Sequence, residues 1–315
     1  ASAGVVLAAS VGARRTQLAV CDLAGEPLAT VEREIDVEQG PDVVLPLIMD
    51  IWSDLLGDRP VSDVWGVGMG VPATVEFAAG RTESARVMAS WTGIAIPPLI
   101  RERFDVPVFV DNDVNVIAMG EHRKVYADQY DDLLFVKVST RIGAGVIAGG
   151  GILRGALGAA GEIGHIPVRD GGGVLCRCGN TDCVDSVASA TAIVRDLRAR
   201  GRDVSSLADA VALVRAGDAE TMAVIRRAGR LLGEVVASAV NLLNPAVVVL
   251  GGDVVEAFQP LVSAVREVVY SRSTALATRS LRIERSVLGS AAGIAGCALL
   301  AIDHVLSAEA VDAPR

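Results

Sequence analysis

The chain has 315 residues, of which 51% are hydrophobic and 3% aromatic, and it carries 38 acidic against 29 basic side chains. A chain of this length and hydrophobicity can bury large cores, which excludes disorder for most of it and favours two domains. The formal charge of -9 excludes a basic nucleic-acid-binding surface, and the scarcity of aromatic residues argues against a base-stacking sheet.

Strand-forming segments separated by glycine-bearing turns open the chain, and they predict a three-stranded antiparallel meander. Apolar residues at helical spacing then predict a helix that begins at Pro41. Two later apolar runs are typical of fully buried strands in a central sheet. The strands predicted for this half cover residues 5–9, 17–22, 28–34, 64–70 and 106–110.

After a predicted helix over residues 114–125, the pattern of a glycine-turned meander followed by helices begins again. Its predicted strands cover residues 133–138, 145–148, 151–153 and 247–250, and its predicted helices cover residues 188–199, 219–243 and 291–306. The repetition predicts an α/β fold of two lobes with a ligand cleft between them. We expect an N-terminal lobe over residues 1–115, onto which the helix at about 290–306 packs back, and a C-terminal lobe over residues 116–289 that carries the dimerisation surface.

No uninterrupted apolar run of about 18 residues occurs, because polar residues and glycines break the best candidate, residues 235–255. The first ten residues carry no basic side chain ahead of their apolar stretch, unlike a secretory signal. The sequence therefore predicts a cytoplasmic protein that does not enter a membrane. Cys21 and Cys297 each stand alone in an apolar segment, which predicts buried thiols.

Four potential metal ligands stand close together in the chain: His165, Cys176, Cys178 and Cys183. One imidazole and three thiolates suit tetrahedral zinc, and four protein ligands leave no open position for water. The sequence therefore predicts a structural zinc site, which would fix His165 and the loop that carries it. The alternative is that the thiols are free or form a disulfide.

The residues around this cluster resemble the signature of the ROK family, which comprises repressors, open reading frames and sugar kinases. The match begins with Gly161-Glu162-Ile163-Gly164-His165 and continues through the cysteines to Asp185. Further matches are Gly68-Met69-Gly70-Val71-Pro72, Asp111-Asn112-Asp113-Val114-Asn115, Asn241-Leu242-Leu243-Asn244-Pro245 and Leu250-Gly251-Gly252. The resemblance implies a two-lobed actin/hexokinase-like fold, a duplicated ribonuclease H-like architecture.

The resemblance also implies a sugar pocket, contacted by Asn112, Asp113, Glu162, His165 and Asp185, the last at a position where glutamate is usual. Carboxylates, an amide and an imidazole can hydrogen-bond the hydroxyl groups of a sugar. His165 would then serve both the zinc ion and the sugar: one ring nitrogen would bind the metal, and the other would face a sugar hydroxyl. Asn112 and Asp113 have an alternative role as caps of the following helix, and Glu162 as an ordinary surface acid.

In the kinases of the family, Asp113 would be the general base, and glycine-rich hairpin loops would hold ATP and Mg²⁺. The first loop usually reads Asp-x-Gly-Gly-Thr, and here the chain has Ser10-Val11-Gly12-Ala13-Arg14. The second usually reads Gly-Thr-Gly-x-Gly, and here the chain has Ser139-Thr140-Arg141-Ile142-Gly143. The remnants of the phosphate-binding loops are thus Ser10, Gly12, Arg14, Thr140, Arg141, Gly143, Gly251 and Gly252.

These departures predict the sugar-sensing part of a ROK-type transcriptional regulator, a pseudo-kinase that turns over no ATP. Its partners would be a small-molecule sugar effector and further copies of itself, as a homodimer or homotetramer. It would reach DNA only through an N-terminal helix-turn-helix that this sequence does not contain. The alternatives are an ATP-dependent hexose or N-acetylhexosamine kinase, similar to ROK glucokinases, and an interaction module that binds neither ligand. Arg14 and Arg141 would either bind an anion such as a phosphorylated sugar or be solvated.

Overall fold

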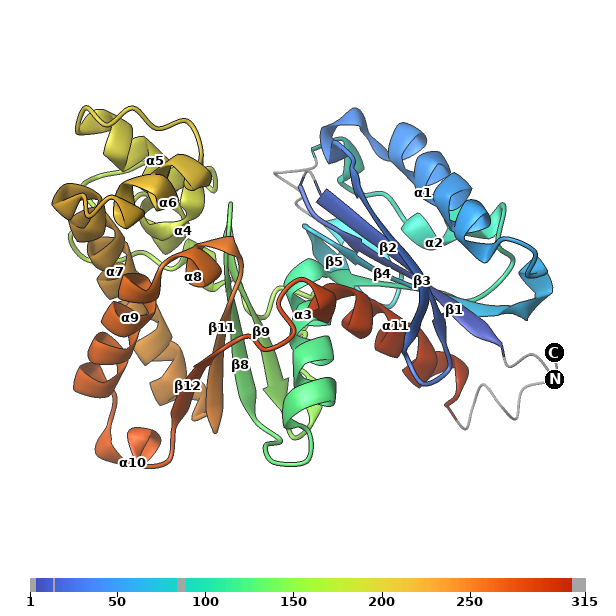
Figure 1. Ribbon diagram of the computed structural model, residues 1–315. Helices are drawn as coiled ribbons and strands as arrows, with labels where there is room; N and C mark the ends of the chain where they lie inside the picture. Colours follow the sequence, from blue (N-terminus) through green and yellow to red (C-terminus); the bar gives the residue numbers. More distant parts are fainter. Residues whose placement is uncertain (1–3, 14, 84–88, 308–315) are drawn as a thin grey trace. The chain divides into compact units, whose positions relative to one another are not determined.

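The computed structural model describes residues 4–13, 15–83 and 89–307 of the chain (Figure 1). It divides into two compact units, each with its own hydrophobic core. The first unit comprises the chain up to Asp128, the segment Gly151–Ala160 and the chain from Ser290 onward. The second comprises the segments Gln129–Gly150 and Gly161–Gly289.

The first unit is built on a five-stranded sheet with the order β3-β2-β1-β4-β7. The first three strands are antiparallel to one another, as the predicted meander requires, and β4 and β7 continue the sheet in parallel. The strands are β1 (Val5–Val11), β2 (Arg15–Asp22), β3 (Pro27–Glu34), β4 (Val64–Val71) and β7 (Val108–Asn112). A separate two-stranded sheet pairs β5 (Thr74–Glu76) with β6 (Arg81–Glu83).

Helices cover both faces of this sheet (Figure 1). Helix α1 (Pro41–Leu56) packs on β2, and the buried Trp52 of α1 donates a hydrogen bond to the carbonyl of Ala8 at 3.2 Å. Helix α11 (Ala291–Val305) packs on β1 and β4. The unit also contains α2 (Ile96–Arg101), α3 (Asp113–Glu121), a π-helix over His122–Tyr126, and 3₁₀ turns over Val37–Gln39, Val61–Asp63 and Ala89–Trp91.

The boundary between the units falls later than the expected residue 115, because α3 packs along α11. The two helices approach so closely that a Cβ atom on Gly296 would lie 1.7 Å from the carbonyl oxygen of Val116. Glycine at this crossing therefore permits the contact, and α3 stays with the first unit. Helix α11, like α3, belongs to the first unit.

The second unit contains the adjacent strands β9-β8-β11-β12, in which β8 and β9 form an antiparallel hairpin and β11 pairs in parallel with both neighbours. These strands are β8 (Leu133–Val138), β9 (Ile142–Ala148), β11 (Val247–Gly251) and β12 (Arg282–Arg285). The short strand β10 (Gly151–Ile152) follows β9 in the chain. The predicted return of the strand pattern in this half is thus present as a β8–β9 hairpin with parallel strands beside it.

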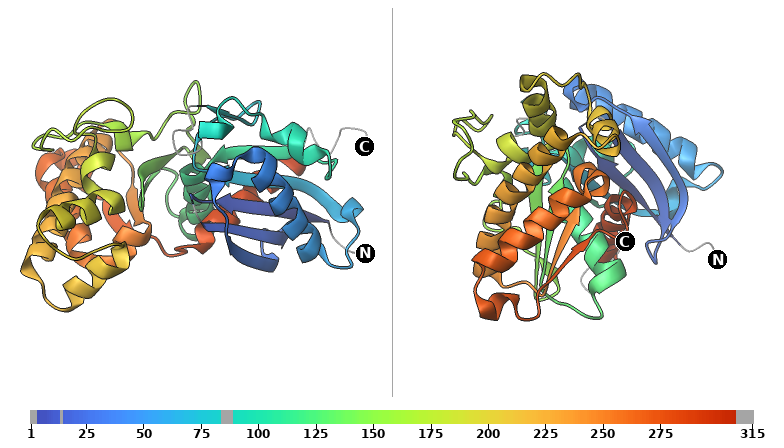
Figure 2. Two further views of the ribbon diagram at one scale, coloured as in Figure 1. Left: turned by 90° about the horizontal axis from the view of Figure 1, so that it is seen from above. Right: turned by 60° about the vertical axis from the view of Figure 1, so that its left-hand side comes forward.

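The helices of the second unit gather on one side of its sheet, coloured yellow to orange in Figure 2. Helix α7 (Ala219–Leu243) has the predicted bounds, and it packs against α9 (Gln259–Arg272). The others are α4 (Val184–Ala188), α5 (Ala190–Ala199), α6 (Leu207–Arg215), α8 (Asp253–Ala257) and α10 (Ala275–Thr278). None of the helices in the described ranges is long and apolar enough to cross a membrane.

Two predicted elements differ from the structure in ways that affect the site. The strand predicted over residues 106–110 lies two residues later, because Asp111 and Asn112 pair with Gly70 and Val71 of β4 despite being polar. The helix predicted over residues 188–199 begins two residues later, because the Ser189 side chain accepts a hydrogen bond from the N–H of Ala192 and caps α5, while Ala188 ends α4.

Candidate functional site

The four predicted metal ligands are brought together by a short loop structure in the second unit. His165 ends a 3₁₀ turn (η5, Ile163–His165), and Cys183 is the N-cap residue of α4. Between them, Cys176 and Asn180 form a tight turn, in which the N–H of Cys176 donates to the carbonyl of Asn180 at 2.8 Å. An antiparallel bridge between Pro167 and Cys183 closes the base of the loop.

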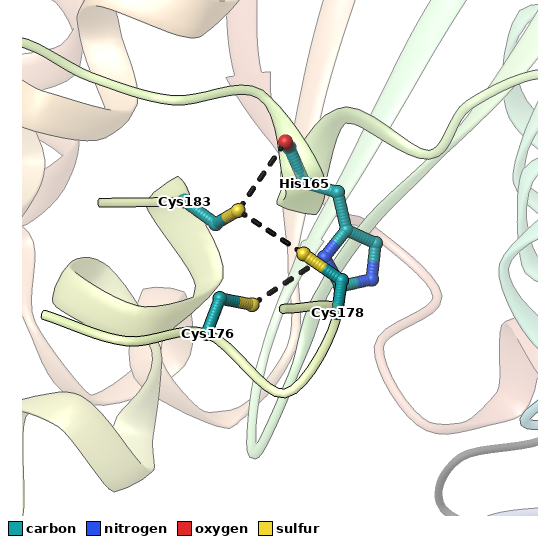
Figure 3. Close-up of side chains that lie close together, drawn as sticks. All are labelled: His165, Cys176, Cys178 and Cys183. Atoms are coloured by element: carbon teal, nitrogen blue, oxygen red, sulfur yellow. Dashed lines mark hydrogen bonds between the residues drawn. The ribbon is translucent and has the colours of Figure 1, made fainter. Parts of the chain in front are cut away.

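The ligand atoms of His165, Cys176, Cys178 and Cys183 all lie within 4.8 Å of one another (Figure 3). The Sγ atoms of Cys178 and Cys183 are 3.5 Å apart, and Nδ1 of His165 is 3.6 Å from Sγ of Cys176. A tetrahedral zinc ion with Zn–S bonds of about 2.3 Å separates its sulfur ligands by about 3.8 Å. The cluster can therefore hold a metal ion, and its three thiols and one imidazole suit zinc.

The pKa values of two of the thiols shift in opposite directions. Among the protein groups alone, the backbone N–H of Asn180 lowers the pKa of Cys178 to about 7, whereas burial raises the pKa of Cys183 to about 12. A divalent cation offsets the cost of burying a thiolate, because it stabilises the charged sulfur directly. All four positions would be taken by protein ligands, so the metal would be structural.

His165 connects the metal cluster to Glu162. Its Nδ1 atom faces Cys176, and its Nε2 atom lies 3.8 Å from the Glu162 carboxylate. A carboxylate beside the second nitrogen of a metal-bound histidine orients the ring and selects its tautomer. The exposed fractions of the two side chains, 36% and 44%, leave both accessible to a ligand from solvent.

Asp185 is bound by the turn between β8 and β9 rather than left open. Its Oδ2 atom accepts a hydrogen bond from the Arg141 guanidinium at 2.7 Å, and its Oδ1 atom accepts one from the N–H of Ile142 at 2.8 Å. The Asp185 side chain is only 8% exposed, and that of Arg141 is 31% exposed. The sequence identified both residues as departures from the family pattern, but it gave no signal that they pair.

The rest of the β8–β9 turn is fixed by neighbouring segments of the same unit. The Ser139 hydroxyl donates to Asp253 at 3.0 Å, and the carbonyl of Thr140 accepts from the Thr191 hydroxyl at 3.4 Å. Gly143 lies in β9 and pairs with Lys137. Gly251 ends β11, and Gly252 has a φ of +93° with a Cβ position only 2.5 Å from the Val138 carbonyl, so only glycine fits there.

The turn between β1 and β2 contains the first predicted phosphate-loop remnants. The N–H of Gly12 donates to the carbonyl of Arg15 at 2.9 Å, and a Cβ atom on Gly12 would lie 2.7 Å from that oxygen. Gly12 is therefore explained by the hairpin itself. Ser10 faces α11, where a Cβ atom on Gly293 would lie 2.2 Å from its hydroxyl oxygen. Arg14 lies outside the described residues.

In the first unit, Asn112 has the helix-capping role that the sequence left open. Its Oδ1 atom accepts hydrogen bonds from the N–H groups of Val114 at 2.8 Å and Asn115 at 3.4 Å, and its Nδ2 atom donates to the carbonyl of Ala73 at 3.0 Å. Asp113 begins α3 and is 7% exposed. Asn112 and Asp113 belong to the first unit, whereas Glu162, His165 and Asp185 belong to the second.

Asp111 is a buried charged residue to which the sequence analysis assigned no role, although it opens one of the family-matching motifs. It is 2% exposed, and it accepts hydrogen bonds from the side chain of Asn115 at 2.8 Å and from Nε of Arg154 at 2.7 Å. The Arg154 guanidinium also lies 3.7 Å from the centre of the Phe77 ring. These contacts hold the segment Gly151–Ala160 to the first unit, directly before the Gly161–His165 motif.

Fold and site together define a two-lobed, actin-like α/β protein of the class that contains sugar kinases and their regulatory relatives. The ROK family model matches residues 6–304, and the chain belongs to the ROK family.

Both kinds of family member are among the similar proteins. The chain is 31% identical to a glucokinase of Halalkalibacterium halodurans over 91% of each chain. It is 28% identical to the xylose repressor of Bacillus subtilis over 96% of this chain and 78% of the repressor. A solved ROK-family transcriptional regulator, a homolog of the E. coli MLC protein, superposes with a TM-score of 0.83 at 26% identity, over 95% of this chain and 78% of that one.

Replacing Cys178 with serine should abolish stable zinc binding. Because a structural site loses its tetrahedral thiolate set with one ligand removed, we expect zinc content to fall from about one ion per chain to near zero, with a lower melting temperature. Metal analysis of the purified variant measures this. Thr181→Ser, a change in the same loop that removes no ligand atom, should keep the metal; full zinc occupancy in Cys178→Ser would contradict the cluster.

Replacing Arg141 with glutamine should destabilise the second unit, because it leaves the buried Asp185 carboxylate without its cation. We expect a loss of about 1–3 kcal/mol in the free energy of unfolding, less than for a fully buried pair since Arg141 is partly exposed. Urea unfolding measures the loss. Arg15→Gln, which breaks an exposed ion pair with Glu32, should cost less than about 1 kcal/mol. Equal effects in the two variants would argue against a buried pair.

Proposed function

We propose that the chain is the sugar-sensing part of a ROK-family transcriptional regulator and does not transfer phosphate. The observation that carries this proposal is the ion pair between Arg141 and Asp185, 2.7 Å long, at the β8–β9 turn. By the family resemblance, this turn is where a kinase presents glycine N–H groups to the phosphates of ATP.

The ion pair works against phosphate binding in two ways. An arginine in place of glycine adds a Cβ atom and a long side chain where backbone N–H groups would need to approach a phosphate closely. Its positive charge is also no substitute, because Asp185 already neutralises it within the protein. An ATP phosphate would have to compete with a carboxylate that is 8% exposed and positioned by a second hydrogen bond from Ile142.

The first loop supports the same conclusion independently. Ser10 stands where the family usually has aspartate, so the loop lacks a carboxylate that could hold magnesium. Ser10 also lies against Gly293 of α11, where a Cβ atom would be 2.2 Å from its hydroxyl oxygen. If each altered loop cost about 2–3 kcal/mol of transition-state stabilisation, the rate would fall by about 10³–10⁴-fold.

Sugar recognition is assigned to Asn112, Asp113, Glu162 and His165, with zinc holding the loop that carries His165. The Nε2 atom of His165 and the carboxylate of Glu162 are both accessible and can hydrogen-bond adjacent hydroxyl groups of a sugar. Asp185 mainly fixes the β8–β9 turn, because both of its carboxylate oxygens already accept hydrogen bonds from that turn. A contact from Asp185 to the sugar is secondary. The sugar would shift the protein between two conformational states by binding one of them more tightly than the other.

The regulator relatives support a sensor of this kind. The xylose repressor and the solved regulator each extend beyond the matched region, since the chain covers 78% of their lengths. DNA contact is assigned to a segment outside this sequence, and self-association to the second unit.

A second candidate is an ATP-dependent hexose or N-acetylhexosamine kinase. It is favoured by the 31% identity to a glucokinase over 91% of both chains and by Asp113, which matches the general base of the family's kinases.

We expect the protein to bind one sugar from a panel of xylose, common hexoses and N-acetylhexosamines without turning it over. Calorimetry measures the binding, and a coupled ADP-release assay with ATP and Mg²⁺ measures turnover of the same sugar. Turnover above about one per second, within the usual range of enzymes, would establish the kinase instead.

The sugar affinity should fall at least about tenfold in Glu162→Gln, because a charge-assisted hydrogen bond to a hydroxyl becomes a neutral one. Glu267→Gln, an equally conservative change at an exposed position on α9, should leave the affinity unchanged. A Glu162→Gln variant with the parent affinity would remove Glu162 from the sugar site. No binding of any sugar in the panel would contradict the sensor.

A further inference from the structure

A cavity of about 370 Å³ that opens to solvent lies in the second unit, between the loop that carries the His/Cys cluster (residues 165–183) and the helices α5 and α7. Its walls include Gly171, Gly172 and Val174 from the loop and Arg195 and Arg227 from the helices. The volume is in the range of small-molecule sites. None of the residues assigned above to sugar or metal lines it.

Two arginines give this cavity a positive charge that the protein does not neutralise. Arg195 donates to the carbonyl of Ser186 at 2.8 Å, and Arg227 donates to the carbonyl of Asp170 at 2.7 Å. Within the described ranges, neither has a carboxylate oxygen within 4.0 Å. A carbonyl accepts one hydrogen bond but leaves the charge of a guanidinium and its other N–H groups available.

The acidic residue at the cavity wall does not cancel this charge. Asp196 lies on the same helix as Arg195, but its carboxylate pairs with Nε of Arg200 at 3.2 Å. Arg200 also lies 3.8 Å from the Glu220 carboxylate, so Arg195 and Arg227 are the wall's excess positive charges, although the whole chain has a formal charge of -9. A local excess of cations in an acidic protein concentrates anions at that place.

The glycine loop adds backbone donors on the opposite wall. In the part of the chain that the structure describes, the N–H groups of Gly171, Gly172 and Gly173 donate no hydrogen bond. Gly172 and Gly173 have φ angles of +91° and +75°, and no atom lies within 4 Å of a Cβ position at Gly172. Gly171 has no positive φ, and successive N–H groups in a turn that joins a right-handed to a left-handed residue form concave anion-binding sites.

We propose that this cavity binds a small organic phosphate, with the phosphate group between the glycine N–H groups and the guanidinium groups of Arg195 and Arg227. Donors from a loop and two helices surround a tetrahedral anion better than a planar carboxylate, which a single arginine would match. The carbon part of the ligand packs against Val174, Val187 and Ala199, which line the remaining wall. The ligand links the loop before Cys176 to α5 and α7, and it binds independently of the proposed sugar site.

Titration of the zinc-loaded protein with glycerol 3-phosphate, followed by NMR of the backbone amides, tests the proposal. We expect the amide signals of Gly171 to Gly173 to shift with saturation, and the affinity to fall about tenfold in Arg195→Gln and in Arg227→Gln. The matched control is Arg230→Gln, an exposed arginine one turn further along α7 that does not line the cavity. Its affinity should equal that of the parent, and zinc content should be unchanged in all three variants.

Three results would overturn the proposal. Affinities of Arg195→Gln and Arg227→Gln within twofold of the parent would exclude their guanidinium groups from the site. An equal loss in Arg230→Gln would show attraction to general surface charge. Loss of zinc together with loss of binding in both cavity variants would show that the arginines only support the loop.

Discussion

Asp185 accepts one hydrogen bond from the Arg141 guanidinium and one from the N–H of Ile142, and this pair of contacts fixes the turn between β8 and β9. Removing one partner of a buried ion pair is costly, because the remaining charge has lost its solvation. Arg141 is therefore expected to stay with Asp185 rather than turn toward a ligand. The proposed lack of phosphate transfer follows from this pairing of Arg141 with Asp185, because by the family resemblance the β8–β9 turn is where a kinase would bind ATP.

The contact also ties this turn to the metal cluster, because Asp185 comes two residues after Cys183 in the chain. Cys183 is the N-cap of α4, and Asp185 lies in the first turn of that helix. On the other side of the cluster, Nε2 of His165 is 3.8 Å from Glu162. A structural metal would thus hold Glu162 and His165, which we propose contact the sugar, and the β8–β9 turn on one rigid segment, which is the coupling that the proposed sensor needs.

Sequence patterns predicted those features that depend on residues close together in the chain. Apolar periodicity predicted helix α7 with its correct bounds. The short distance along the chain between His165 and the three cysteines predicted that their ligand atoms would cluster, as they do. The pairs Arg141–Asp185 and Arg154–Asp111 join residues 44 and 43 positions apart, so no local pattern could predict them. The sequence allowed Asn112 to be either a helix cap or a sugar-binding residue. The structure shows the cap, because the partner for that role, the N–H of Val114, is part of the same chain.

Direct binding of nucleotide to the protein tests the central claim most closely. Calorimetry with the non-hydrolysable analogue AMPPNP and Mg²⁺, in the presence of the sugar that binds, should give no saturable heat up to millimolar nucleotide. Such a result would fit a β8–β9 turn that Arg141 and Asp185 keep closed to phosphate. A dissociation constant in the micromolar range, the usual range for enzyme substrates, would contradict it.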